Sequence, residues 1–107
     1  MKLKNIKIPK EEISNLCQYW HIQKLSLFGS VLRDDFTPDS DIDILVEFEV
    51  GFTPSFFKLY QIQEELSQLF DGRTIDLVTL KSLNHRIRER VLATAEVCYG
   101  LSVYLYK

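Results

Sequence analysis

The chain has 107 residues, of which 46% are hydrophobic and 26% are charged, and its formal net charge at pH 7 is −2. This length suffices for one hydrophobic core and is too short for two, so a single domain over residues 1–107 is predicted. The weakly negative charge argues against a nucleic-acid binder that depends on many phosphate contacts. The sequence has no apolar run of about 20 residues, as a membrane span requires, and residues 1–7 lack the apolar centre of a signal peptide. A cytoplasmic protein without a membrane partner is therefore expected.

Cysteine usage agrees with this expectation. Cys17 and Cys98 lie far apart in the sequence and have no spacing typical of metal ligands. Two buried thiols in a reducing compartment are the simplest interpretation.

The N-terminal third combines a helical pattern with an extended one. Residues 9–20 begin with Pro-Lys-Glu-Glu and place apolar side chains at steps of three and four, which predicts a helix. Residues 25–28 predict a short strand that ends at Gly29, and residues 30–33 predict one or two helical turns. Ser30 would then lie near a helix start, where free backbone N–H groups point toward a ligand.

A second strand is predicted over residues 41–48, after a turn at residues 37–40. Because side chains alternate along a strand, Asp41 and Asp43 fall on one face and the isoleucines that follow them fall on the other. Unpaired buried carboxylates are costly and repel each other. The pair therefore favours a cation between the two side chains.

The remaining residues predict a long helix, a third strand and a last helix. Thr53-Pro54 predicts an N-cap with a first-turn proline, and Asp71-Gly72 predicts the helix end. Residues 74–79 predict a strand that contains one acid, Asp76, and residues 83–95 predict the last helix. The apolar positions of the long helix include Phe56, Leu59, Tyr60, Leu66, Leu69 and Phe70.

The expected order of elements is α-β-α-β-α-β-α. This order predicts an α/β (α+β) fold in which a small mixed sheet of three or more strands is flanked by helices. The tail, residues 99–107, alternates apolar and polar side chains. It could add an edge strand, dock on the core or offer an apolar surface to a partner.

The three aspartates have the chemistry of a metal site. Magnesium takes one or two protein carboxylates together with substrate phosphate oxygens. Asp41 and Asp43 can supply such ligands, and Asp76 on a neighbouring strand can complete a two-ion site. Asp76 could instead act as the general base that removes the proton of an acceptor hydroxyl.

The residues before the aspartates have the chemistry of a phosphate site. Gly29 lets the backbone approach a phosphate closely, and Ser30 can donate hydrogen bonds to it. Arg33 could reach the same phosphates, although a surface ion pair with Asp34 or Asp35 is an equal alternative. Alone, Gly-Ser is commonly only a turn, and Asp-x-Asp only a solvated strand end. Their occurrence together favours the functional interpretation.

At these residues the sequence resembles the nucleotidyltransferase superfamily of the DNA polymerase β type, in particular its minimal members. The matching pattern is Gly29-Ser30, ten intervening residues, Asp41-Ile42-Asp43, and then Asp76 as the acid of the third strand. The resemblance extends to about Tyr99. It implies that the first two aspartates bind magnesium with the nucleotide, that Gly-Ser holds phosphate, and that Asp76 binds metal or activates the acceptor.

The minimal members look like antitoxins that are paired with HEPN-domain ribonuclease toxins and transfer AMP from ATP to a toxin tyrosine. The resemblance therefore implies a magnesium-dependent protein adenylyltransferase that uses ATP and forms a hetero-oligomer with a HEPN toxin. Two alternatives remain open. One is an antitoxin that blocks its toxin sterically through the tail and the arginine-bearing last helix. The other is nucleotide transfer to a small molecule or to RNA, although a chain too short for an acceptor domain favours an acceptor held by another protein.

Overall fold

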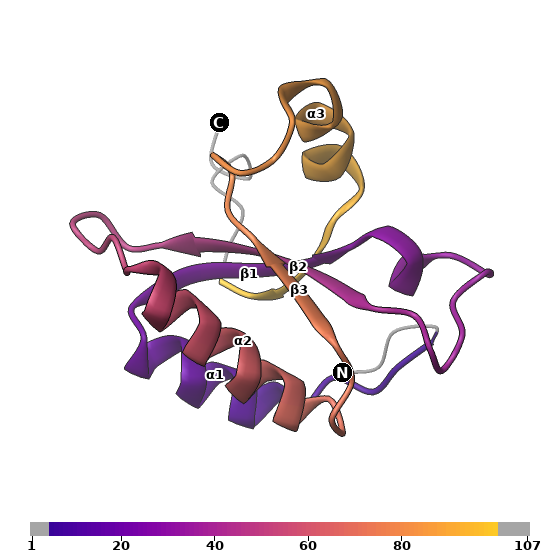
Figure 1. The fold of residues 1–107 in the computed structure, drawn as a ribbon, viewed down its shortest axis with the longest axis horizontal. Coiled ribbons are helices and arrows are strands. Elements are labelled where there is room, and N and C mark those ends of the chain that lie inside the picture. The colour runs from indigo at the N-terminus through magenta and orange to yellow at the C-terminus, as the bar shows by residue number, and fades with distance from the viewer. Residues whose placement is uncertain (1–4, 101–107) are drawn as a thin grey trace.

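The computed structural model describes residues 5–100 and has a mixed α/β fold, as the sequence predicted. Figure 1 shows one sheet with two helices on one face and a third helix on the other. The strands are β1 (Ile22–Phe28), β2 (Ile42–Phe48), β3 (Ile75–Val78) and β4 (Glu96–Tyr99). The helices are α1 (Lys10–Tyr19), α2 (Phe56–Leu69), α3 (His85–Thr94) and a short 3-10 helix, η1 (Gly29–Leu32). Within residues 5–100 no helix has the length and apolar character needed to cross a membrane.

The sheet has the strand order β3-β2-β1-β4. β1 pairs antiparallel with both β2 and β4, whereas β2 and β3 are parallel. The parallel pair requires a long crossover, and α2 provides it. The sheet is therefore mixed, as expected.

The fourth strand is absent from the predicted order of elements. Ala95 ends α3 with an extended backbone, and the chain enters β4 directly without a turn residue. The sequence placed the candidate edge strand in the tail, of which residues 101–107 lie outside the described part of the chain. The edge strand that the structure describes lies just before it, beside β1.

The alternation predicted for β2 is confirmed by the two faces of the sheet. Ile42, Ile44 and Val46 belong to the main core, where α1 and α2 cover the sheet. Leu45 points to the other face and packs with Leu83 and Val91, next to and within α3. Asp43 is on the same face of β2 as Leu45, so it lies opposite the main core.

The start of α2 differs from the prediction. Ser55, not Thr53, is the N-cap, and its hydroxyl accepts a hydrogen bond of 3.3 Å from the Lys58 amide. The side chains of Phe56 and Tyr60, expected on the apolar face, are 92% and 60% exposed. The buried positions of this segment are Ile62, Leu66 and Phe70. At 100° per residue Tyr60 lies about 160° around the helix from Ile62 and about 120° from Leu66, so it faces away from the sheet. Phe56 is the first residue of α2, and its side chain extends into solvent.

The end of α2 agrees with the prediction. Asp71 and Gly72 have φ angles of 60° and 81°, the left-handed conformation that commonly follows a helix.

Both cysteines are free and buried, as the sequence predicted. Cys17 lies in α1 and Cys98 in β4, and both belong to the main core. The Cys98 thiol donates a hydrogen bond of 3.3 Å to the Leu25 carbonyl. Burial raises the pKa of each thiol to about 12.

Candidate active site

The parallel pairing of β2 and β3 brings two of the predicted acids together. Asp43 and Asp76 are direct partners in the register of the two strands. Asp41 immediately precedes the first residue of β2. Asp43 is half-buried, while Asp41 and Asp76 are exposed, so the acids lie on a surface that substrates can reach.

The proximity of these acids is visible in their electrostatics. The pKa of Asp43 is raised to about 6, first by burial, then by the negative charges of Asp76 and Asp41, and then by a hydrogen bond with Asp76. The positive charge of Arg33 acts in the opposite direction on this pKa. A cation bound here would relieve the repulsion between the carboxylates.

Gly29 places the start of η1 directly against Asp43. β1 ends at Phe28, the register partner of Asp43, and Gly29 follows with a φ of +77°. A Cβ atom at position 29 would fall on Oδ2 of Asp43. Glycine is therefore required both by the backbone conformation and by the close carboxylate.

Ser30 lies within the short helix η1, and Arg33 is the residue directly after it. The Ser30 hydroxyl donates a long hydrogen bond of 3.5 Å to the Asp41 carbonyl, which links η1 to the start of β2. The Arg33 side chain is exposed, and its Nε pairs with Asp35 Oδ1 at 3.2 Å. The ion pair considered from the sequence is therefore the contact that Arg33 makes in this structure.

Two side chains that the sequence did not single out hold the backbone around the site. Asn5 Nδ2 donates to the carbonyls of Val31 and Arg33, at 2.6 and 2.9 Å, and so fixes the end of η1. Arg73 contacts the loop that precedes Asp41. Both side chains bind segments that are distant in the sequence, and no local pattern identifies such contacts.

The acids fit a magnesium ion that is shared with a substrate better than one enclosed by protein alone. Among residues 5–100 no group of three or more His, Cys, Asp or Glu side chains is arranged to hold a metal ion. The pair Asp43 and Asp76, with Asp41 close enough to shift a pKa, offers carboxylate oxygens on an open surface. Magnesium accepts such a partial ligand set and completes it with water and phosphate oxygens.

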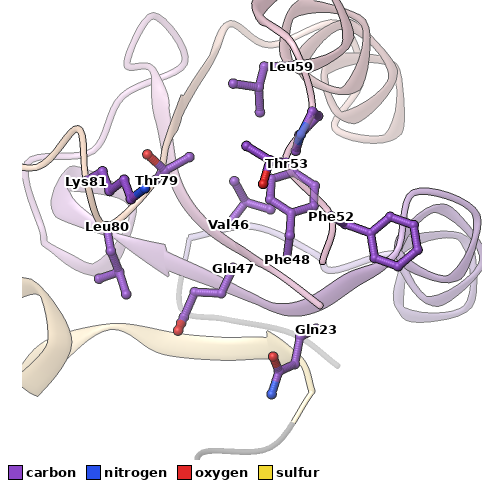
Figure 2. Close-up of a pocket in the computed structure, with 11 residues that line it drawn as sticks. Gln23, Val46, Glu47, Phe48, Phe52, Thr53, Leu59, Thr79, Leu80 and Lys81 are labelled. Carbon is purple, nitrogen blue, oxygen red and sulfur yellow. The ribbon is translucent and has the colours of Figure 1, made fainter. Parts of the chain in front are cut away.

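A separate cavity lies at the other end of β2. It has a volume of about 440 Å³, and the residues that line it come from β1, from the end of β2 and the loop that follows it, from α2 and from the segment after β3 (Figure 2). Its lining residues are Gln23, Val46, Glu47, Phe48, Phe52, Thr53, Pro54, Leu59, Thr79, Leu80 and Lys81. None of the six predicted site residues is among them, so the acids belong to an open surface and not to this cavity.

Comparison with known proteins supports the class that the fold and acids define. The nucleotidyltransferase domain family matches residues 10–98 of the chain. The protein adenylyltransferase MntA of Thermococcus cleftensis is 40% identical over 78 residues, which cover 73% of this chain and 74% of that protein. MJ1379 of Methanocaldococcus jannaschii, named as a candidate protein adenylyltransferase, is 38% identical over 62% of this chain, and the match spans 65% of that relative's length.

Solved structures give the same fold. A structure described as a candidate minimal nucleotidyltransferase has a TM-score of 0.69 and 34% identity, over 89% of this chain and 94% of that chain. A toxin-antitoxin structure with AMP-PNP also has a TM-score of 0.69, with 24% identity over 88% of this chain and 75% of that chain. The chain belongs to the nucleotidyltransferase domain family, and within it to the group of minimal nucleotidyltransferases that includes MntA.

Proposed function

We propose that this chain is a magnesium-dependent adenylyltransferase that transfers AMP from ATP to a tyrosine of a HEPN-type toxin and thereby acts as its antitoxin. The observation that carries the proposal is the register of Asp43 opposite Asp76, with Gly29 directly against Asp43. This arrangement places carboxylates beside a turn suited to phosphate, which is what nucleotidyl transfer requires.

The names of the similar proteins support AMP as the transferred group. The relative from Thermococcus cleftensis is named a protein adenylyltransferase. One structural neighbour comes from a toxin-antitoxin structure with AMP-PNP, and another comes from a complex described as a tri-AMPylated HEPN toxin of Shewanella oneidensis with an MNT antitoxin. A HEPN toxin as partner and ATP as substrate are the corresponding proposals for this chain.

The three acids and the Gly-Ser turn each have a role in this proposal. Asp41 and Asp43 hold the magnesium ion, which neutralises the triphosphate and orients it when bound. Gly29 and Ser30 hold the phosphates through the backbone and the hydroxyl at the start of η1. Asp76 shares the metal or accepts the proton of the tyrosine hydroxyl.

AMP transfer occurs in a single displacement at the α-phosphorus of ATP. The tyrosine oxygen forms a bond to the α-phosphorus of ATP, the bond between the α-phosphorus and the bridging oxygen breaks, and pyrophosphate leaves. The hydroxyl proton passes to Asp76 or to solvent.

The test is incubation of the purified chain with ATP, magnesium and the protein encoded by the neighbouring gene, followed by intact mass measurement. We expect an AMP adduct on the neighbour, located on a tyrosine by peptide mapping. A chain with both Asp41→Asn and Asp43→Asn should form no adduct. A neighbour without an adduct, or an unchanged rate in the double variant, would contradict the proposal.

A second candidate function is steric neutralisation without catalysis. It is favoured by the aromatic side chains at the start of α2, where Phe56 and Phe57 are 92% and 80% exposed. Exposed apolar groups of this size commonly mark protein contacts. If the double aspartate variant still binds the toxin and protects cells, occlusion is sufficient. If it binds the toxin without protecting cells, catalysis is required.

A further inference from the structure

The loop between η1 and β2 joins the two halves of the candidate site. It runs over residues 33–41, lacks regular secondary structure and ends at Asp41. Within it, the Ser40 amide donates to the Thr37 carbonyl at 3.0 Å and closes a turn. The position of Asp41 therefore depends on what holds this turn in place.

Arg73 contacts this turn from the segment just before β3, the strand at the edge of the sheet next to β2. Its Nη1 donates to the carbonyls of Thr37 and Ser40, each at 3.4 Å. Its guanidinium carbon lies 4.6 Å from the centre of the Phe36 ring. One side chain thus makes three contacts with a loop that lies more than 30 residues earlier in the sequence.

The backbone of Arg73 is itself fixed between α2 and β3. The Ser67 hydroxyl donates to the Arg73 carbonyl at 2.6 Å, and the Arg73 amide donates to the Phe70 carbonyl at 3.2 Å. The next residue, Thr74, accepts a hydrogen bond of 2.9 Å from the Ile42 amide at the start of β2. Arg73 therefore extends from the strand of Asp76 to the loop of Asp41.

We propose that Arg73 is a positioning residue that holds the 33–41 loop so that Asp41 can share a metal ion with Asp43. This inference rests on the proposed function of the acids. The planar guanidinium can donate to two carbonyls while its face lies on an aromatic ring, and a lysine ammonium cannot make all three contacts together. Fixing the loop before the ligand arrives lowers the entropy lost when magnesium and nucleotide bind.

The experiment compares Arg73→Ala and Arg73→Lys with the wild type in magnesium titrations of fluorescent ATP binding and in steady-state AMP transfer. In Arg73→Ala we expect the half-saturating magnesium concentration and the KM for ATP to rise about tenfold, which corresponds to a loss of about 1.4 kcal/mol. We expect kcat to change by less than about threefold, since Arg73 does not touch the reacting atoms. Arg73→Lys should recover part of the loss.

Lys10→Ala is the matched control. Lys10 is the first residue of α1, in the helical layer on the opposite face of the sheet, and its replacement also removes one positive charge. It should leave both binding curves unchanged. Hydrogen–deuterium exchange should be faster over residues 33–41 in Arg73→Ala and unchanged in β1 and β2.

The outcomes separate the two proposals. A wild type without magnesium-dependent ATP binding would overturn the proposed function itself. A wild type that binds, together with an Arg73→Ala variant of equal magnesium dependence, would overturn the role of Arg73 alone. If Arg73→Ala does not fold, Arg73→Lys and Phe36→Leu decide, because each weakens only part of the contact. Both should then raise the half-saturating magnesium concentration, by about two- to fivefold, and no rise in either would also overturn the role of Arg73.

Discussion

Single residues determine how closely the charged groups of this site approach one another. Asp43 has the carboxyl of Asp76 beside it on the next strand and the backbone of Gly29 directly against its own oxygen. Because of these neighbours, position 29 has no room for a side chain. The Asp43 carboxylate is stabilised when it binds a proton or a cation.

Gly29→Ala should abolish AMP transfer. The added Cβ would collide with Asp43 Oδ2, and the residue would keep a φ of +77° that alanine disfavours. Gly51→Ala is the control, since Gly51 has a φ of +92° and no atom within 4 Å of the added Cβ. Both variants should lose about 1 kcal/mol or more of stability, measured by thermal unfolding. Equal transfer rates in the two variants would contradict the collision.

Asp43→Asn should stabilise the metal-free protein at pH 8 and have little effect near pH 4. The pKa of Asp43 is about 6 in the folded protein against an ordinary value of 3.8, so the folded state binds this proton more tightly than the unfolded chain. The free energy of unfolding therefore falls as the pH rises through about 6, and asparagine removes this loss.

After allowance for solvent screening, we expect a gain of about 1 kcal/mol at pH 8, or about 4–8 °C in Tm. Calorimetry of both proteins in a chelating buffer measures it. Asp39→Asn is the control, because Asp39 is an exposed carboxylate in the turn before the acids. A gain that does not depend on pH would contradict the assignment.

At the scale of the elements, local patterns predicted those features that depend on near neighbours. The alternation in β2 and the left-handed residues after α2 were correct because each is determined within a few positions. The strand β4 was missed because it has four residues and follows α3 without a turn residue. The positions of Phe56 and Tyr60 were wrong because apolar residues can occupy more than one face of a helix.

The same distinction applies to the site. The motif Gly29-Ser30 with Asp41, Asp43 and Asp76 was evident from spacing, and the structure brings Asp43, Asp76 and Gly29 together. The contacts of Asn5 and Arg73 could not be predicted, since both side chains bind backbone carbonyls of distant residues, and any residue type could provide those. Three-dimensional proximity alone identifies them.

The start of α2 provides a prediction at this scale. Ser55→Ala should lower stability by about 1 kcal/mol, because its hydroxyl accepts the hydrogen bond from the Lys58 amide that caps the helix. Thr53→Ala, at the position that the sequence favoured, should change stability by less than about 0.5 kcal/mol. Urea unfolding of the two variants compares them directly. A larger loss of stability in Thr53→Ala than in Ser55→Ala would contradict the assignment of Ser55 as the N-cap.

The molecule as a whole buries its two sheet faces unequally. The main core lies between the sheet and the layer of α1 and α2, whereas the cluster on the other face has only Leu45, Leu83 and Val91 as buried members among the described residues. Little apolar area thus holds α3 to the rest of the domain. The free energy of local opening should differ between the two faces.

Native-state hydrogen exchange should show this difference. Amides of α3 are expected to exchange through a local opening, while amides in the buried half of α2 should exchange only with global unfolding. We expect the opening free energy of α3 to be lower than that of α2 at every denaturant concentration below the unfolding transition. Val91→Ala should lower it further, and Thr94→Ala, at the exposed end of α3, serves as the control. Equal opening free energies in α2 and α3 would contradict the inequality.

The two buried thiols give the protein an internal probe of its own opening. Burial raises the pKa of each thiol to about 12, so almost none of either thiol is ionised at pH 8 in the folded state, whereas an ordinary cysteine has a pKa near 8.5 and ionises readily. An alkylating reagent such as iodoacetamide will therefore label Cys17 and Cys98 only when the core between α1 and β4 opens. The rate of labelling reports that event in the unmodified chain, and a ligand that binds only the folded state, such as the proposed nucleotide or toxin, should slow it.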